Sequence, residues 1–149
     1  MRAIILIEDS PRMYSILLPL IYREIVSLTK TLMKKTFSST YKSMHLRGRI
    51  KVLLTPNFET AEKFSNKYGD NIVGIISDVK FLNNGKKDSK AGARFAKSIR
   101  EKHPSMPIML QSTDNSNRKL AEKLGTDFLH KESNTLLNDL RNFMLINFG

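Results

Sequence analysis

The sequence predicts an α/β protein with a doubly wound sheet of five parallel strands and an extended first helix. Short runs rich in Ile, Leu and Val recur through the 149 residues, and each is followed by a polar segment whose apolar residues have helical spacing. Nearly unbroken apolar runs are typical of strands that helices cover on both faces of a parallel sheet. The five expected strands lie at residues 3–7, 50–54, 72–76, 108–110 and 127–129.

The first helix is expected to begin near Met13 and to be unusually long. Residues 13–44 contain no glycine, but Pro19 lies among them and removes a backbone hydrogen bond, so the element should be bent or broken. Its second half is basic and rich in Ser and Thr. Its first half is amphipathic, with an apolar face suited to covering a sheet: Ile16, Leu17, Leu20, Ile21, Ile25 and Leu28.

The later helices have clearer ends. Three are expected at residues 58–68, 91–102 and 115–124, which stop at Gly69, at the His103-Pro104 pair and at Gly125. The last helix follows Ser133, a residue type that caps helix N-termini. Its apolar stripe consists of Leu136, Leu137, Leu140, Phe143 and Met144.

Composition limits the class of protein. Hydrophobic residues at 40% and charged residues at 26% are typical of a globular chain, and the length fits one domain, residues 1–149. Cysteine is absent, which excludes disulfides, Cys-based zinc sites and thiol nucleophiles; three scattered histidines argue against a His-only metal site. The apolar run at residues 3–7 is too short for a signal peptide or a membrane span, so we expect a cytoplasmic protein with no membrane partner.

The formal net charge of +11 is concentrated in one stretch. Residues 30–51 contain seven Lys or Arg and no Asp or Glu. We favour the solvated face of a long first helix as the explanation. The alternatives are a site for nucleic acid, an anionic surface or an acidic partner domain, because clustered cations attract such surfaces; nucleic acid is less favoured but stays open.

Polar residues follow four of the expected strands. They are the pairs Glu8-Asp9, Ser77-Asp78, Gln111-Ser112 and His130-Lys131. The carboxyl ends of parallel strands meet at one rim, where open α/β sheets bind ligands. Three carboxylates brought together repel one another, and their oxygen atoms suit Mg²⁺. With that ion and an ammonium group beside it, Asp78 is placed to act as a nucleophile toward a phosphoryl group.

Four motifs at these strand ends resemble those of the receiver domains of two-component signalling. The motifs are Ile-Leu-Ile-Glu-Asp-Ser at 5–10, Ile-Ile-Ser-Asp at 75–78, Pro-Ile-Met-Leu-Gln-Ser at 107–112 and Asp-Phe-Leu-His-Lys at 127–131. The resemblance covers residues 2–148 and implies a flavodoxin-like strand order of 2-1-3-4-5. By this resemblance, Mg²⁺ is bound by Glu8, Asp9, Asp78 and the backbone carbonyl of Lys80. Asp78 accepts the phosphoryl group with the help of Lys131 and Ser112. Phe128 is the aromatic residue of the conformational switch.

The resemblance also implies a function. A receiver takes a phosphoryl group from a histidine kinase, a phosphotransfer protein or a small donor such as acetyl phosphate, and catalyses only its own phosphorylation and dephosphorylation. Its switched face then meets a fused or separate output domain, or a second copy in a homodimer. Segments at 10–15, 18–22, 76–81 and 145–149 are similar to receivers at the N-terminus of long proteins with phosphoenolpyruvate-synthase or pyruvate phosphate dikinase-like modules, which would make this chain a fragment.

Three features depart from the receiver pattern. The segment between Asp9 and the second strand is longer than usual, and so is the loop at 81–90, which carries three lysines. We expect this loop to alter either the access of the phosphodonor or the lifetime of the acyl phosphate. Glu132 also stands where a proline is usual after the lysine, so a cis peptide bond is not assumed there.

Each site residue also has a structural interpretation. Glu8 and Asp9 suit a helix N-terminus, Asp78 a turn, Ser112 a cap of the fourth helix, Lys131 a surface charge and Phe128 the core. On that basis the alternative function is a pseudo-receiver that is never phosphorylated and binds through residues 30–51. A small flavodoxin-like enzyme is disfavoured, because no Gly-rich phosphate loop follows the first strand.

Overall fold

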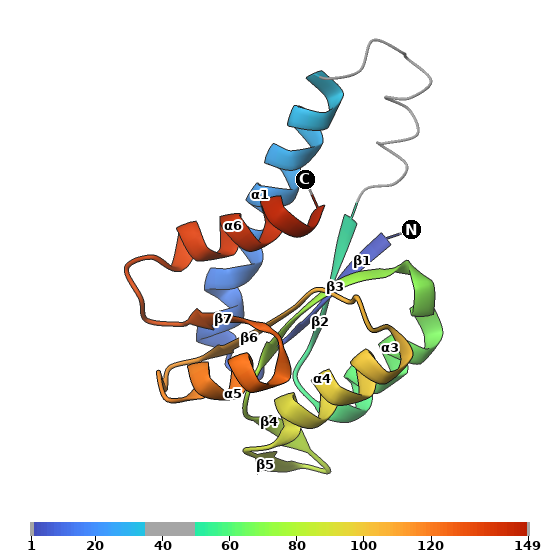
Figure 1. Ribbon diagram of the computed structural model, residues 1–149, viewed down its shortest axis with the longest axis vertical. Helices are drawn as coiled ribbons and strands as arrows, with labels where there is room; N and C mark the ends of the chain where they lie inside the picture. Colours follow the sequence, from blue (N-terminus) through green and yellow to red (C-terminus); the bar gives the residue numbers. More distant parts are fainter. Residues whose placement is uncertain (1, 35–49, 149) are drawn as a thin grey trace.

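The computed structural model describes residues 2–34 and 50–148, and its centre is a five-stranded parallel sheet (Figure 1). The strand order is β2-β1-β3-β6-β7, which is 2-1-3-4-5 when only these five strands are counted along the chain. The doubly wound, flavodoxin-like prediction is therefore confirmed. The strands are β1 (Arg2–Ile7), β2 (Ile50–Thr55), β3 (Ile72–Asp78), β6 (Ile108–Ser112) and β7 (Asp127–His130).

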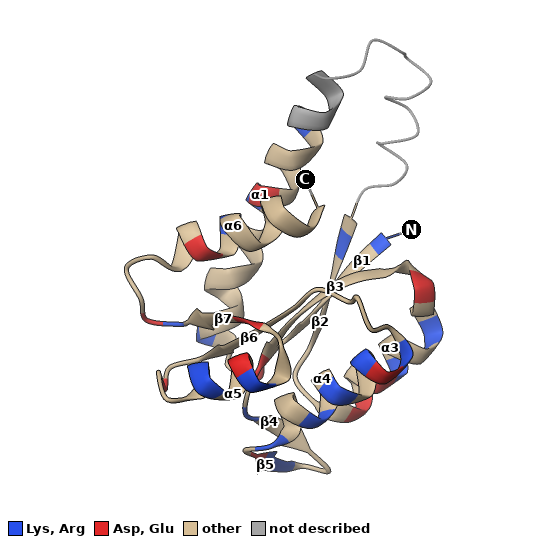
Figure 2. Ribbon diagram, in the orientation of Figure 1, with Lys and Arg blue, Asp and Glu red and all other residues tan. Residues whose placement is uncertain are grey.

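Helices cover both faces of the sheet. On one face lie α1 (Pro11–Lys34) and α6 (Leu136–Phe148), and on the other α3 (Phe58–Tyr68), α4 (Ala91–Lys102) and α5 (Asn117–Leu124); a 3₁₀ turn, η1 (Gly69–Asn71), follows α3. Successive side chains of β1 alternate between the two cores: Ile4 and Leu6 pack under α1, whereas Ile5 and Ile7 pack under α3 and α4. Figure 2 shows most charged segments on the helices and few on the strands.

Helix α1 differs from the expectation in two ways. It continues through Pro19, so the helix is not broken there, and of the expected bend or break the break is wrong. Pro19 and Ser15 are both exposed, and the Ser15 carbonyl that loses its amide partner can bond to water instead. Ile16, expected on the sheet-facing side, is 42% exposed, while Leu17 and Ile21 are fully buried. Most of the basic stretch at residues 30–51, namely 35–49, lies outside the described residues.

The segment expected to be a loop at 81–90 contains a β-hairpin, which corrects that prediction. Strands β4 (Phe81–Asn83) and β5 (Lys86–Asp88) pair antiparallel around Asn84 and Gly85, whose φ angles are 53° and 77°. A two-residue turn with both φ angles positive favours Asn-Gly, which is the strongest short-range hairpin signal in a sequence. The Asn84-Gly85 pair is therefore a local signal for this hairpin.

The helix ends follow the sequence signals with small shifts. Gly125 has a φ of 69° and ends α5, as expected of a glycine in the left-handed region. The last helix begins at Leu136, three residues after Ser133, whose hydroxyl oxygen accepts a hydrogen bond from the Thr135 amide in the preceding turn. Among residues 2–34 and 50–148, no helix has both the length and the apolar character needed to cross a membrane.

Candidate acidic site at the carboxyl ends of the strands

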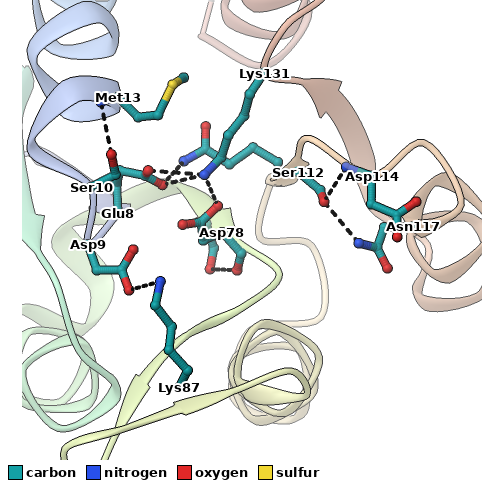
Figure 3. A network of polar contacts seen from close by, with 12 residues as sticks. Glu8, Asp9, Ser10, Met13, Asp78, Lys87, Ser112, Asp114, Asn117 and Lys131 are labelled. Carbon is teal, nitrogen blue, oxygen red and sulfur yellow. Dashed lines mark hydrogen bonds and ion pairs between the residues drawn. The ribbon is translucent and has the colours of Figure 1, made fainter.

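Three carboxylates meet where β1 and β3 end. Glu8 and Asp9 directly follow β1, and Asp78 is the last residue of β3, which is paired with β1 in parallel register. One oxygen of each carboxylate lies within 4.8 Å of the others. The sequence-based expectation that these three side chains gather at one rim agrees with this geometry (Figure 3).

Lys131 lies between two of the three carboxylates. Its Nζ is 2.8 Å and 3.0 Å from the two carboxylate oxygens of Glu8, and it also forms an ion pair with Oδ1 of Asp78. The Lys131 side chain is only 9% exposed, so this contact is shielded from solvent. Its backbone amide donates to the Ser112 carbonyl at 3.0 Å, which fixes the residue at the end of β7 without any cis peptide bond.

Gln111 supports the same cluster from β6. Its Nε2 donates to Oε2 of Glu8 at 3.2 Å, and both side chains are fully buried. From the sequence, Gln111 was expected only to lie at the end of a strand, with no functional role. A polar side chain within a buried strand, directly before Ser112, was the available signal, because a buried amide needs a hydrogen-bond partner.

Burial determines the protonation of Asp78. Burial and the neighbouring Glu8 raise the pKa of Asp78 well above its ordinary value, and the attraction of Lys131 offsets only part of this. Burial lowers the pKa of Lys131, but the two carboxylates raise it by more, so its pKa lies above its ordinary value. Lys131 therefore stays charged, and Asp78 favours its protonated form unless a further positive charge is added.

A cavity of about 530 Å³ opens at this rim. Asp9, Asp78 and Lys131 line it, together with Ser112 and Lys80. The three clustered carboxyl groups supply hard oxygen donors within 4.8 Å of one another, and donors of this kind fit Mg²⁺ or Mn²⁺. The residues at the rim thus suit a divalent cation.

Ser112 faces the cavity and is held by the start of the next helix. Its Oγ accepts hydrogen bonds from the Asp114 amide at 3.0 Å and from Nδ2 of Asn117 at 2.9 Å. Asn117 is the first residue of α5, which is the helix expected fourth from the sequence. The structural interpretation of Ser112 as a cap of that helix therefore also has support. Both bonds use the hydroxyl as an acceptor, which leaves its proton available to donate.

Phe128 is separated from the acidic cavity. It is half-buried and packs on the core under α3, α4 and α5, and the Arg118 guanidinium lies 4.8 Å from the centre of its ring. Both residues line a second cavity of about 240 Å³ beside α6. Phe128 is therefore linked to Ser112 through neighbouring residues of α5, Asn117 and Arg118, and not by direct contact.

Two residues from the segment after Asp78 complete the site. Lys87 of β5 forms an ion pair with Asp9, and the sequence indicated only that lysines would lie nearby. Gly92 lies in the first turn of α4 and donates to the Val79 carbonyl at 3.0 Å. A Cβ atom at Gly92 would overlap the backbone of Asp78 and Val79, so a glycine is required for α4 to approach the acidic residue this closely.

No protein-family model matches the sequence, and no curated protein matches it significantly. Solved structures do resemble the fold. A candidate response regulator from Chloroflexus aurantiacus J-10-fl has a TM-score of 0.61 at 17% identity, over 97% of this chain and 98% of that one. A response regulator receiver domain from Rhodospirillum rubrum has a TM-score of 0.57 at 14% identity, over 97% and 92%. The Mn²⁺-bound response regulator Rcp1 has a TM-score of 0.51 at 13% identity, over 98% and 91%.

Proposed function

We propose that this chain is a response-regulator receiver domain, which accepts a phosphoryl group on Asp78 in a Mg²⁺-dependent reaction and thereby changes a protein-binding surface. The chain has the fold of response-regulator receiver domains. The observation that carries the proposal is the environment of the Asp78 side chain. Asp78 is 5% exposed, and its carboxyl group lines the cavity, contacts Lys131 and lies within 4.8 Å of carboxylate oxygens of Glu8 and Asp9.

The reaction is an in-line phosphoryl transfer. A carboxylate oxygen of Asp78 attacks the phosphorus of the donor, a new O–P bond forms, and the bond to the leaving group breaks. The leaving group, an imidazole or an acetate, departs with the bonding electron pair. Lys131 is already in contact with Asp78 and is therefore placed to stabilise the negative oxygens of the transferred group.

The metal site of this proposal consists of Glu8, Asp9, Asp78 and the backbone carbonyl of Lys80. Three of these supply the clustered carboxylate oxygens, and Lys80 lines the same cavity. The Mn²⁺-bound form of one structural neighbour supports a divalent ion in this fold. A bound Mg²⁺ supplies positive charge that favours the ionised form of Asp78 and offsets the charge of the phosphoryl oxygens.

Switching is assigned to Ser112 and Phe128. The Ser112 hydroxyl can donate its proton to a phosphoryl oxygen. A shift of the Ser112 side chain toward that oxygen would disturb the hydrogen bonds that it accepts from Asp114 and Asn117. Arg118 follows Asn117 in α5 and lies over the Phe128 ring, so the disturbance reaches the surface formed by α5, β7 and α6.

Partners follow from this assignment. The donor is a histidine kinase, a phosphotransfer protein or a small phosphodonor, and the switched surface meets a separate or fused output domain or a second copy of the chain. We assign residues 1–149 to one receiver domain that acts in the cytoplasm. Its chemistry is confined to the addition and removal of its own phosphoryl group.

The proposal is tested by incubating the protein with Mg²⁺ and acetyl phosphate and measuring intact mass. One phosphoryl group per chain is expected for the wild type and none for Asp78→Asn, because an amide cannot form the acyl phosphate. Asp70→Asn, which removes an exposed carboxylate in η1, is the control for the loss of one charge and should still be labelled. Labelling that persists in Asp78→Asn would refute the assignment.

A further inference from the structure

A lysine of the hairpin reaches the acidic site from outside the sheet. The Nζ of Lys87 is 2.5 Å from Oδ2 of Asp9. Figure 3 shows the two side chains pointing toward one another. The Asp9 side chain is only 8% exposed, whereas that of Lys87 is 54% exposed. The hairpin thus delivers a positive charge from the surface to a largely buried carboxylate.

The hairpin that carries Lys87 is fixed to the rest of the molecule. At its start, Phe81 is fully buried and stacks on Phe58 with ring centres 6.3 Å apart. At its end, Asp88 accepts hydrogen bonds from Asn83, from the Lys90 amide and from Arg94, at 3.1, 2.9 and 3.0 Å. The backbone of β5 is therefore held in place, and only the Lys87 side chain needs to move for the contact with Asp9 to break.

Strand geometry distinguishes Lys87 from the lysine beside it. Successive side chains of a strand point to opposite faces, so Lys86 and Lys87 leave β5 in opposite directions. Of the two, Lys87 lines the acidic cavity and Lys86 does not. Both are exposed and carry the same charge, which makes Lys86 a matched control for the loss of one positive charge from the hairpin.

Two lysines share the three carboxylates unequally. Lys131 is 9% exposed and contacts both Glu8 and Asp78, whereas Lys87 is mostly exposed and contacts Asp9. A cation that binds through Asp9 meets Lys87 at the carboxylate. Because the Lys87 side chain is more than half exposed, its pair with Asp9 is weaker than the buried pairs of Lys131, and Lys87 is the lysine that such a cation displaces.

We propose that Lys87 is a tethered counter-ion that competes with the divalent metal for Asp9 and lowers the affinity of the site for that metal. This inference rests on the proposed function, in which Asp9 is a metal ligand. It adds to that function a residue that does not lie at a strand end of the main sheet and that sets how tightly the site binds the metal. The hairpin lysine and the metal exclude one another at one carboxylate oxygen.

The test is calorimetric titration of Mg²⁺ and of Mn²⁺ into four proteins: wild type, Lys87→Gln, Lys87→Arg and Lys86→Gln. Lys87→Gln should bind both metals roughly three- to tenfold more tightly, as expected for loss of one partly exposed ion pair. Lys86→Gln should stay within about twofold of wild type, because it removes the same charge without opening Asp9. Lys87→Arg retains the cation and should restore an affinity close to that of wild type.

A second readout follows the hairpin itself. In amide NMR spectra, metal should shift the β5 signals of the wild type, since Lys87 leaves Asp9, and should shift them much less in Lys87→Gln. Equal affinities for Lys87→Gln and Lys86→Gln would overturn the inference, and so would an absence of metal binding in every variant. Failure of the phosphoryl-labelling test with the Lys87 effect intact would instead overturn the proposed function alone.

Discussion

The two lysines at the acidic site show how differently a strand end and a hairpin supply the same charge. Lys131 follows the core strand β7, is nearly buried, and contacts two carboxylates that have little access to solvent. Lys87 belongs to a two-stranded hairpin at the surface, is mostly exposed, and contacts one carboxylate. Removing one member of a buried ion pair lowers the stability strongly, because its partner is left as an unpaired buried charge. An ion pair with an exposed side chain contributes little to stability. Lys131 should therefore maintain the site, and Lys87 should adjust it.

The largest effect is expected from Lys131→Met. This change leaves the fully buried Glu8 and the nearly buried Asp78 without their shared cation, and should lower the free energy of unfolding by about 3 kcal/mol in metal-free buffer. Urea denaturation measures this loss. Saturating Mg²⁺ should recover part of it by supplying another positive charge, while a loss below about 1 kcal/mol would show that Lys131 is no more important than an exposed lysine.

An intermediate and pH-dependent effect is expected from Asp78→Asn in metal-free buffer. The pKa of Asp78 is raised above its usual value of 3.8, so the wild type loses stability as the pH rises from about 4 toward the raised pKa of the folded protein. Asparagine does not ionise and escapes this loss. The variant should be more stable than wild type by at least about 1 kcal/mol at pH 8, with the difference disappearing near pH 4.

Thermal denaturation between pH 4 and pH 8 measures this difference. Asp70→Asn, which removes an exposed carboxylate in η1, controls for the change in net charge. An advantage of Asp78→Asn that is the same at both pH values would contradict the assignment, because it would have to arise from packing and not from ionisation.

The smallest effect is expected from Lys87→Gln. Its contact with Asp9 involves a side chain that is 54% exposed, so the free energy of unfolding should change by less than about 1 kcal/mol in metal-free buffer. Urea denaturation of Lys87→Gln beside Lys131→Met compares the two lysines directly. Similar losses for the two variants would remove the distinction between a strand-end lysine that maintains the site and a hairpin lysine that adjusts it.

The strand ends illustrate what can be read from local sequence. The apolar runs predicted the parallel strands, and because the carboxyl ends of such strands share one rim, the order of residues alone was enough to place Glu8, Asp9, Asp78 and Lys131 together. The hairpin is predictable in the same way, since Asn84-Gly85 marks a two-residue turn. Continuity of α1 through Pro19 is not, because it depends on which side of the helix faces solvent.

The sequence by itself determined the order of the five sheet strands and their covering helices, the doubly wound sheet and the residues at its polar rim, because these depend on periodicity and on residues adjacent to the strands. Tertiary structure alone decided the partners: Gln111 on Glu8, Asn117 on Ser112, Arg118 on Phe128 and Lys87 on Asp9. Each of these pairs joins side chains from different elements. Their meeting depends on how strands, helices and the hairpin are arranged around the rim, which the spacing of residues along the chain does not specify.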